Sequence, residues 1–307
     1  MSDKSIEERI SMLAGMGLPS SILRGLPNGA QEKMEDFIKE KISQIRNYTP
    51  KVGVFGNSGV GKSSLCNALF GKEVAKISDV EACTRGPQEI LIGKNNGEGG
   101  IILIDVPGIG EDPEHHQEYT KLYISLASEL DLILWLIKAD DRNYASSLEA
   151  YKNVKKANPE IPVIFVITQV AKTNPFREWN FQKNEPGIDQ KKNIVVKEHD
   201  ISKRFEISTK FIISISSEEK FNLKKLVDLV VEVLPNETKY SFTRETKEEN
   251  VSEEARANAE KGAWENTWES VKEWLGEMYD KFKEPLKELA VGIIEKTIQN
   301  ILGKYKS

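Results

Sequence analysis

Residues 54–65 read VFGNSGVGKSSL, and their pattern of glycines indicates the class of fold. Gly56, Gly61, Lys62 and Ser63 stand at the G-x-x-x-x-G-K-[ST] spacing, between a strand-like apolar run and a helix-like segment. In this context a glycine-rich loop wraps its backbone N–H groups around phosphate at the N-terminus of a helix. We expect Lys62 to reach the β- and γ-phosphates and the Ser63 hydroxyl to bind Mg²⁺. The predicted nucleotide-binding residues of this loop are Asn57, Ser58, Gly59, Val60, Gly61, Lys62, Ser63 and Ser64.

Short apolar runs alternate with helix-like segments on both sides of this loop, up to about Pro235. The runs are KVGVFG, EILIG, IILIDV, LILWLI, PVIFVIT and FIISIS, and the helical patterns include SSLCNALF, SLEAYKNVKKA and LKKLVDLVVEVL. Such alternation is typical of βα units around a mostly parallel sheet. The sequence therefore predicts an α/β, doubly wound domain at 49–236. Around it we expect an N-terminal helical segment at 1–48, a polar segment at 237–252 that is either a linker or a solvated helix start, and a C-terminal helical region at 253–307.

The two flanking regions carry apolar stripes at helical spacing. One stripe is Met34, Ile38, Ile42 and Ile45, and the other is Trp264, Trp268, Val271, Leu275, Met278 and Phe282. We predict that the C-terminal stripe folds back on the helix that carries Ile38 and Ile42. A membrane role is less favoured, because the polar side of the last helical segment mixes lysine with glutamate.

Composition narrows the classes of protein further. The 307 residues are 39% apolar and carry a net charge of -5, with acidic and basic residues interspersed, which does not favour a general nucleic-acid binder. Cys66 and Cys83 match no metal-ligand spacing and are expected to be reduced thiols. The N-terminus is charged, and no run reaches the roughly 18 apolar residues of a spanning helix. We expect a cytoplasmic protein, at most peripheral to a membrane.

A second motif supports the phosphate site. The run IILIDVPGIG places Asp105 at a strand end and Gly108 three residues later. Asp105 would hold Mg²⁺ through a water, and the Gly108 N–H would sense the γ-phosphate. Thr84, in EACTRG, is the candidate hydroxyl that closes on Mg²⁺ only when the γ-phosphate is present, although an ordinary loop threonine is the alternative. The predicted metal set is Ser63, Thr84 and Asp105.

The runs GKSSLCNALF, SDVEACTR, DVPGIGE and LILWLIKADDR resemble the P-loop GTPases of the Era, EngA and septin group. More closely, they resemble the bacterial YfjP/YeeP-type GTPases, described as a 50S ribosome-binding GTPase domain. The likeness covers about Leu18 to Pro235. It implies a Ras-like G-domain fold and GTP/GDP switching with slow hydrolysis. It also implies the roles given above to Lys62, Ser63, Thr84, Asp105 and Gly108.

The sequence near the D-x-x-G motif offers few side chains that could orient the attacking water. Ile109 follows the D-x-x-G pattern where Ras-like switches have a water-orienting Gln, so intrinsic hydrolysis should be slow. His115 and His116 are either groups that act on the water or solvated residues opening the next helix. Asp140 and Asp141 are expected to cap the helix after LILWLIK rather than to serve as an acid and a base. The predicted catalytic residues are Lys62, Thr84, Gly108 and His115.

The base-recognition segment is degenerate. The GTPase motif N/T-K-x-D ends in an Asp that accepts two hydrogen bonds from guanine. Here Thr168 fits the first position, Gln169 replaces the Lys, and Ala171 replaces the Asp. Ser216 and Ser217 are the best candidates for the fifth motif, which faces the base oxygen. The phosphate chemistry is thus better specified than the identity of the base.

A long connection, AKTNPFREWNFQKNEPGIDQ, follows this segment, and such loops are usually functional or mobile. Phe176, Trp179 and Phe181 either stack over the base or pack the loop onto its own domain. Glu178 or Asp189 is the alternative reader of the base in place of the missing Asp.

Three hypotheses of function follow, in this order. The first is a switch GTPase whose nucleotide state controls docking to a partner such as the ribosome. The second is a self-assembling GTPase of dynamin-like or immunity-related type, which forms nucleotide-dependent homodimers and acts at a membrane. The third, from Ala171 and Ile109 together, is a hydrolysis-deficient pseudo-GTPase that binds nucleotide without turnover.

Overall fold

The computed structural model describes residues 30–71, 88–92, 100–105, 116–276, 290–294 and 296–298 of the chain. Its centre is a six-stranded sheet with the strand order β2-β3-β1-β4-β5-β6. The strands are β1 (Lys51–Gly56), β2 (Gln88–Ile92), β3 (Ile101–Asp105), β4 (Leu132–Lys138), β5 (Val163–Thr168) and β6 (Ile212–Ser214). Neighbouring strands are parallel except β2 and β3, which are antiparallel. The predicted mostly parallel α/β sheet is confirmed.

The central strands are buried on both faces because their sequences are almost entirely apolar. In β4, Leu132, Leu134 and Leu136 belong to one core cluster, whereas Ile133, Trp135 and Ile137 belong to the other. Successive side chains of a strand point to opposite faces, so an uninterrupted apolar run requires helices on both sides of the sheet.

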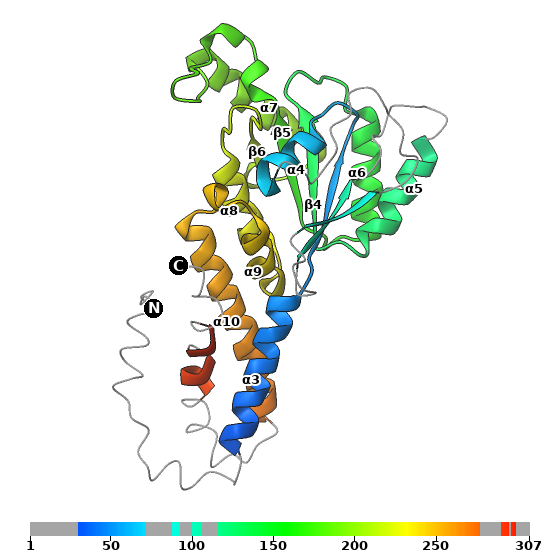
Figure 1. The fold of residues 1–307 in the computed structure, drawn as a ribbon. Helices are drawn as coiled ribbons and strands as arrows, with labels where there is room; N and C mark the ends of the chain where they lie inside the picture. Colours follow the sequence, from blue (N-terminus) through cyan, green and yellow to red (C-terminus); the bar gives the residue numbers. More distant parts are fainter. Residues whose placement is uncertain are drawn as a thin grey trace.

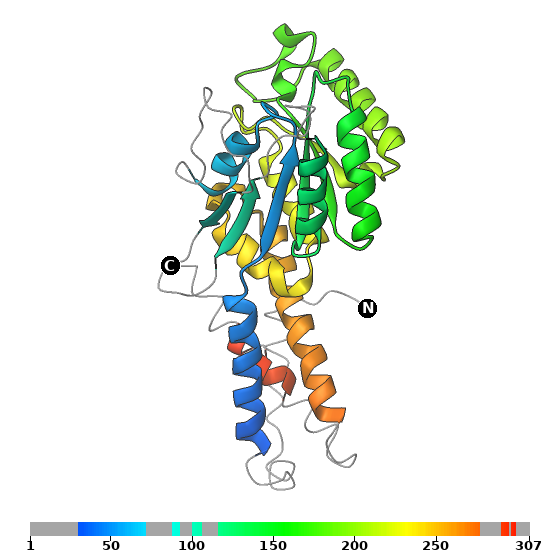
Figure 2. The same ribbon diagram turned by 90° about the vertical axis from the view of Figure 1, so that its right-hand side faces the viewer.

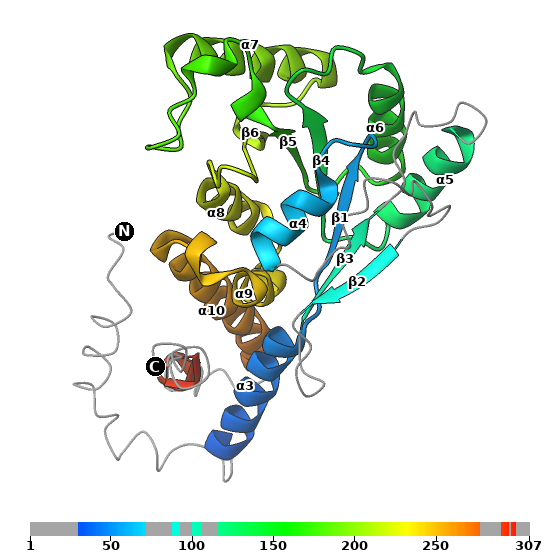
Figure 3. The ribbon, with the colours of Figure 1, turned by 45° about the horizontal axis from the view of Figure 1, so that its top comes forward.

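Those helices divide between the two faces as the two core clusters show (Figure 3). On one face lie α4 (Lys62–Phe70) and α8 (Leu223–Val233), together with α9 (Asn236–Glu245) and the start of α10 (Glu253–Gly276). On the other lie α5 (His116–Ala127), α6 (Ala145–Ala157) and α7 (Ile188–Phe205). The doubly wound arrangement brings the carboxyl ends of the parallel strands to one edge, where nucleotide sites form in such folds.

A helical extension projects from the opposite edge, where α3 (Ala30–Asn47) and the later part of α10 run alongside each other (Figures 1 and 2). We use this name for α3, α9, α10 and residues 290–294 and 296–298, which share a third apolar core. Its buried members are Ile38, Ile42, Ile45, Tyr240, Ala263, Val271, Ala290, Ile294 and Ile298. Trp264 and Trp268 stack beside it, with ring centroids 5.7 Å apart. The predicted fold-back of the C-terminal stripe is confirmed as far as Val271. The side chain of Leu275, and Met278 and Phe282, lie outside the described residues.

The sequence prediction for 237–252 is a polar linker or a solvated helix start, and the structure differs from it. This segment forms the packed helix α9 and a connector, Thr246 to Ser252, that contains a 3-10 turn at Glu248–Asn250. Thr238, Ser241 and Phe242 are fully buried. Ser241 and Arg244 bind main-chain oxygens at the end of α3, and Lys247 and Asn250 bind main-chain oxygens at the end of α4.

Candidate nucleotide-binding site

The loop from β1 to α4 has the backbone that the phosphate motif requires. Gly56 has a φ of 147°, and a Cβ atom there would lie 2.6 Å from the main-chain oxygen of Leu136. Only glycine fits at this close approach between β1 and β4. Gly61 has a φ of 96° and is the N-cap residue of α4. The chain therefore turns sharply from the strand into the helix.

The N-terminus of α4 is suited to an anion. The first intrahelical bond of this end runs from the N–H of Leu65 to the oxygen of Gly61, at 2.9 Å. The N–H groups of Ser63 and Ser64 precede it, and the first N–H groups of a helix have no carbonyl of their own helix to bind. Among the described residues, no side chain caps this end and no carboxylate lies in the first turn. The helix dipole and these N–H groups favour phosphate here.

The Lys62 side chain folds over the start of the loop. Its ammonium donates to the main-chain oxygens of Gly56, at 3.2 Å, and Asn57, at 3.3 Å. The Asn57 side chain accepts a hydrogen bond from the buried hydroxyl of Ser147 on α6, at 3.3 Å. Ser147 was not predicted from the sequence, where its only signal is a small polar residue on the apolar face of a helix.

The predicted Mg²⁺ ligands are described in part. Ser63, half-buried, lies in the first turn of α4. Asp105 ends β3, and the parallel register sets its backbone beside Val54 of β1, so both positions lie at the same edge of the sheet. A hydroxyl and a carboxylate are the oxygen ligands that Mg²⁺ prefers. The side chain of Asp105 lies outside the described part of the chain, as do the residues Thr84, Gly108, Ile109 and His115.

The base-recognition segment contacts the phosphate loop directly. Thr168, at the end of β5, is 2% exposed, and its hydroxyl donates to the main-chain oxygen of Val60 at 2.6 Å. Gln169 has a φ of 57°, and its amide donates to the oxygen of Gly59 at 3.1 Å. The two predicted residues therefore fix the outer half of the loop from a neighbouring strand. Gln169 occupies the position of the lysine in the N/T-K-x-D motif, and through this bond it has a structural role there.

Ala171 lies in the 3-10 turn Val170–Lys172, directly after these contacts. Its side chain is a methyl group packed at the edge of the second core cluster, so it presents no hydrogen-bond acceptor. Its main-chain oxygen and that of Thr173 face the amide of Gln190, at 3.5 and 2.8 Å. Gln190, on α7, is fully buried and was missed by sequence analysis. It holds the turn in place without replacing the absent carboxylate.

The loop after β6 lies next to the 3-10 turn that carries Ala171. The N–H of Ile215 donates to the oxygen of Ile167, and its own oxygen accepts from the N–H of Val170 at 3.2 Å. Ser216 is 2% exposed and forms a short antiparallel bridge with Phe221, whereas Ser217 is half-buried. The predicted fifth-motif residues therefore lie beside the turn that carries Ala171.

The long loop after the Ala171 turn packs against the rest of the domain through Trp179. Trp179 is 4% exposed and meets Phe221 edge to face, at 5.4 Å between ring centroids. For Trp179, packing against the domain is thus the correct alternative. Phe176 and Phe181 remain 58% and 68% exposed.

The two carboxylates proposed as substitute readers of the base lie at the N-terminus of α7. Glu178 accepts a hydrogen bond from the N–H of Asp189 at 3.0 Å, and the Asp189 carboxylate pairs with Lys192 at 2.8 Å. Carboxylates at this end of a helix are stabilised by its dipole. Glu178 is therefore bound to an N–H at the start of α7 and Asp189 to a lysine of the same helix, rather than to the turn that carries Ala171.

Asp140 and Asp141 do not cap α6, contrary to prediction. The helix begins after Tyr144, whose side chain makes no capping bond, and the N–H of its first residue, Ala145, donates to the Asn143 side chain at 3.2 Å. Asp140 pairs with Lys138 at 3.2 Å, and Asp141 accepts from the N–H of Asn143 at 3.0 Å. The helix starts later than its polar sequence implied, so the two carboxylates shape the loop before it.

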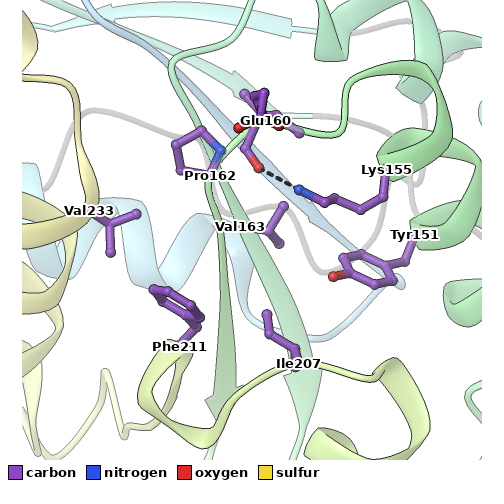
Figure 4. Close-up of a pocket in the computed structure, with 9 residues that line it drawn as sticks. Tyr151, Lys155, Glu160, Pro162, Val163, Ile207, Phe211 and Val233 are labelled. Carbon is purple, nitrogen blue, oxygen red and sulfur yellow. Dashed lines mark hydrogen bonds between the residues drawn. The ribbon is translucent and has the colours of Figure 1, made fainter.

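A cavity of about 320 Å³ lies at the opposite edge of the sheet, where β5 begins (Figure 4). Val163, Phe211 and Val233 give it an apolar wall. Lys155 points its ammonium at the main-chain oxygens of Pro159 and Ile161, and burial lowers its pKa. The cavity is therefore separate from the phosphate loop.

A family model described as 50S ribosome-binding GTPase matches residues 51–169. The uncharacterized protein YfjP of Escherichia coli (strain K12) is 37% identical over 215 residues, which cover 70% of this chain and 71% of that protein. The chain belongs to this family of GTPases. GTPase Era of Clostridium kluyveri is 26% identical over 190 residues, covering 62% of this chain and 57% of that relative.

Among solved structures, an Era variant from Aquifex aeolicus bound to GDP and AlF4⁻ is 29% identical, with a TM-score of 0.47, over 61% of this chain and 57% of that chain. The family, the strand order and the loop from β1 to α4 together identify a Ras-like P-loop G domain that binds a nucleotide. Within the described residues of this GTPase, each helix is too short or too polar to span a bilayer.

Proposed function

We propose that the protein is a Mg²⁺-dependent guanine-nucleotide switch with slow GTP hydrolysis and weak selectivity for the base. One observation carries the proposal. Thr168 and Gln169 hold the phosphate loop as a functional site would require, while Ala171 supplies a methyl group where a carboxylate reads guanine. Affinity then comes mainly from the phosphates and Mg²⁺.

In the proposed cycle, the Lys62 ammonium gives up its hydrogen bonds to the main-chain oxygens of Gly56 and Asn57 and binds the phosphate of the nucleotide instead. Ser63, Thr84 and Asp105 are the proposed Mg²⁺ ligands, and the ion neutralises charge on the β- and γ-phosphates. The Gly108 N–H is assigned to the γ-phosphate, and His115 to the attacking water.

Slow turnover is expected because Ile109 lacks a polar group to orient that water. The relative rate of turnover distinguishes a switch from a pseudo-GTPase. Phosphate release under multiple-turnover conditions should be slow but measurable, and should disappear in Lys62→Ala. Tight binding without any release of phosphate would instead support the pseudo-GTPase.

The base-selectivity proposal is tested by calorimetric titration with GTP and ATP, together with identification of the nucleotide that copurifies. We expect both to bind, with guanine preferred by far less than the thousandfold that a carboxylate reader gives. A wild type that prefers GTP about a thousandfold, roughly 4 kcal/mol, contradicts it.

The family description motivates the proposal that the ribosome is the partner. We expect the protein to cosediment with 50S subunits in the presence of GTP but not GDP. We also propose that the protein is located in the cytoplasm. The helical extension favours a second candidate, a nucleotide-dependent homodimer of dynamin-like type. Light scattering with GDP and with a non-hydrolysable GTP analogue distinguishes them, because only the second candidate doubles in mass.

A further inference from the structure

The C-terminal end of α4, far from the phosphate loop, is bound by the connector between α9 and α10. The Lys247 ammonium donates to the oxygen of Asn67 at 2.9 Å, and the Lys247 N–H donates to the oxygen of Leu69 at 2.9 Å. The Asn250 amide donates to the oxygen of Ala68, also at 2.9 Å. The last carbonyls of a helix have no intrahelical partner. Here the carbonyls of Ala68 and Leu69, and that of Asn67, which also accepts the N–H of Gly71, are bound by residues about 180 positions later in the chain.

Side-chain packing reinforces these bonds. Phe70, the last residue of α4, meets Phe242 of α9 edge to face, with ring centroids 5.8 Å apart. Phe242 is fully buried. The end of α4 is therefore fixed by both a polar and an apolar contact.

The same segment also binds the end of α3. Ser241 of α9 lies 3.4 Å from the oxygen of Ile45, and Arg244 donates to the oxygen of Arg46 at 2.8 Å. At the end of the connector, the hydroxyl of Ser252 accepts from the N–H of Ala255 at 2.9 Å and so caps α10. One short stretch thus joins the phosphate-binding helix to two helices of the extension.

We propose that residues 236–252 couple nucleotide binding to the helical extension, with Lys247 and Asn250 as the residues that position α4. The inference rests on the proposed function, because it concerns regulation of the same site. A nucleotide that tightens the N-terminal turn of α4 acts on a helix of nine residues, about 13 Å long, whose other end is held by the connector. Because coupling between sites is reciprocal, a partner that binds the extension alters nucleotide affinity by the same factor.

Hydrogen–deuterium exchange on the full chain tests this, with GDP and Mg²⁺ as the probe. In the wild type, nucleotide should slow amide exchange in the connector and the first turns of α10, in addition to the phosphate loop. In the double variant Lys247→Met/Asn250→Ala, the phosphate loop should still respond, the response of α10 should be lost, and nucleotide affinity should fall about fivefold.

The matched control is Ser241→Ala, which removes a contact of α9 to the end of α3 and none to α4. It should keep the α10 response and the affinity. Lys247→Met alone retains the aliphatic stem and serves if the double variant does not fold. A wild type that binds GDP without any change in α10 overturns the inference, as does a variant that keeps the full response. A wild type that binds no nucleotide contradicts the proposed function instead.

Discussion

Lys62 is the charged residue of the phosphate motif, and its ammonium binds two main-chain oxygens of the loop. Lys62→Ala should remove most nucleotide affinity, because a charge-assisted hydrogen bond of about 1.5–3 kcal/mol and a counter-charge are lost together. Titration with a fluorescent nucleotide measures the effect. Lys156→Ala, at an exposed position in the last turn of α6, is the control and should bind normally. Affinity of Lys62→Ala within twofold of the wild type would rule out the phosphate-site assignment.

Ala171 is the position at which base selectivity should be recoverable. Ala171→Asp should raise the ratio of GTP to ATP affinity by at least about tenfold, since each bond from the base to an ionised carboxylate is worth about 1.5–3 kcal/mol. ATP affinity should change little. Calorimetry with both nucleotides gives the ratio, and Ala171→Asn, of similar size but neutral, should gain less. No gain from the aspartate would mean that the turn does not face the base.

At the scale of elements, the join between β1 and α4 depends on Gly56. Gly56→Ala sets a methyl group against the Leu136 oxygen at a positive φ, and should cost about 3 kcal/mol or more. Gly59→Ala is the matched comparison, because φ is 68° there and no atom of the described residues lies within 4 Å of the added Cβ. It should cost only about 1–2 kcal/mol. Urea denaturation measures both, and equal costs would contradict the close approach.

Elements whose signals are local were predictable from the sequence. The strands followed from apolar runs such as LILWLIK, and the phosphate loop from glycine spacing, because both reflect neighbours in the chain. Thr168 and Gln169 were assigned to the site for the same reason. That Thr168 and Gln169 also hold the phosphate loop was not predictable, because those bonds span more than 100 residues.

The burial of helix α9 was not predictable for a physical reason of the same kind. Its sequence, NETKYSFTRE, is polar, and polarity was interpreted as exposure to water. Ser241 and Arg244 instead bind carbonyls at the end of α3, nearly 200 positions earlier in the chain. A polar side chain that caps a distant helix has no periodic pattern in the sequence. Gln190 is fully buried and binds the main chain after the Ala171 turn, and it was not predictable for the same reason.

At the scale of the whole molecule, the helical extension depends on an apolar core shared by distant segments. Ile42, 1% exposed, lies in that core, and Ile42→Ala should lower the free energy of unfolding by about 2–5 kcal/mol. Val196→Ala, at a position on α7 that is 65% exposed, should change it by less than about 0.5 kcal/mol. Chemical denaturation compares the two. If Ile42→Ala is as mild as the control, the extension does not contribute to the folded state as described.

The contact between Ser241 and the end of α3 spans 196 residues, and this separation matters while the protein is being made. A ribosome adds about 5–20 residues per second, so about 10–40 seconds pass between the synthesis of α3 and the synthesis of α9. During that time Ile38, Ile42 and Ile45 have none of their final partners from α9 and α10. The newly synthesised chain is therefore exposed to aggregation at α3, and a chaperone that shields α3 would raise the yield of folded protein.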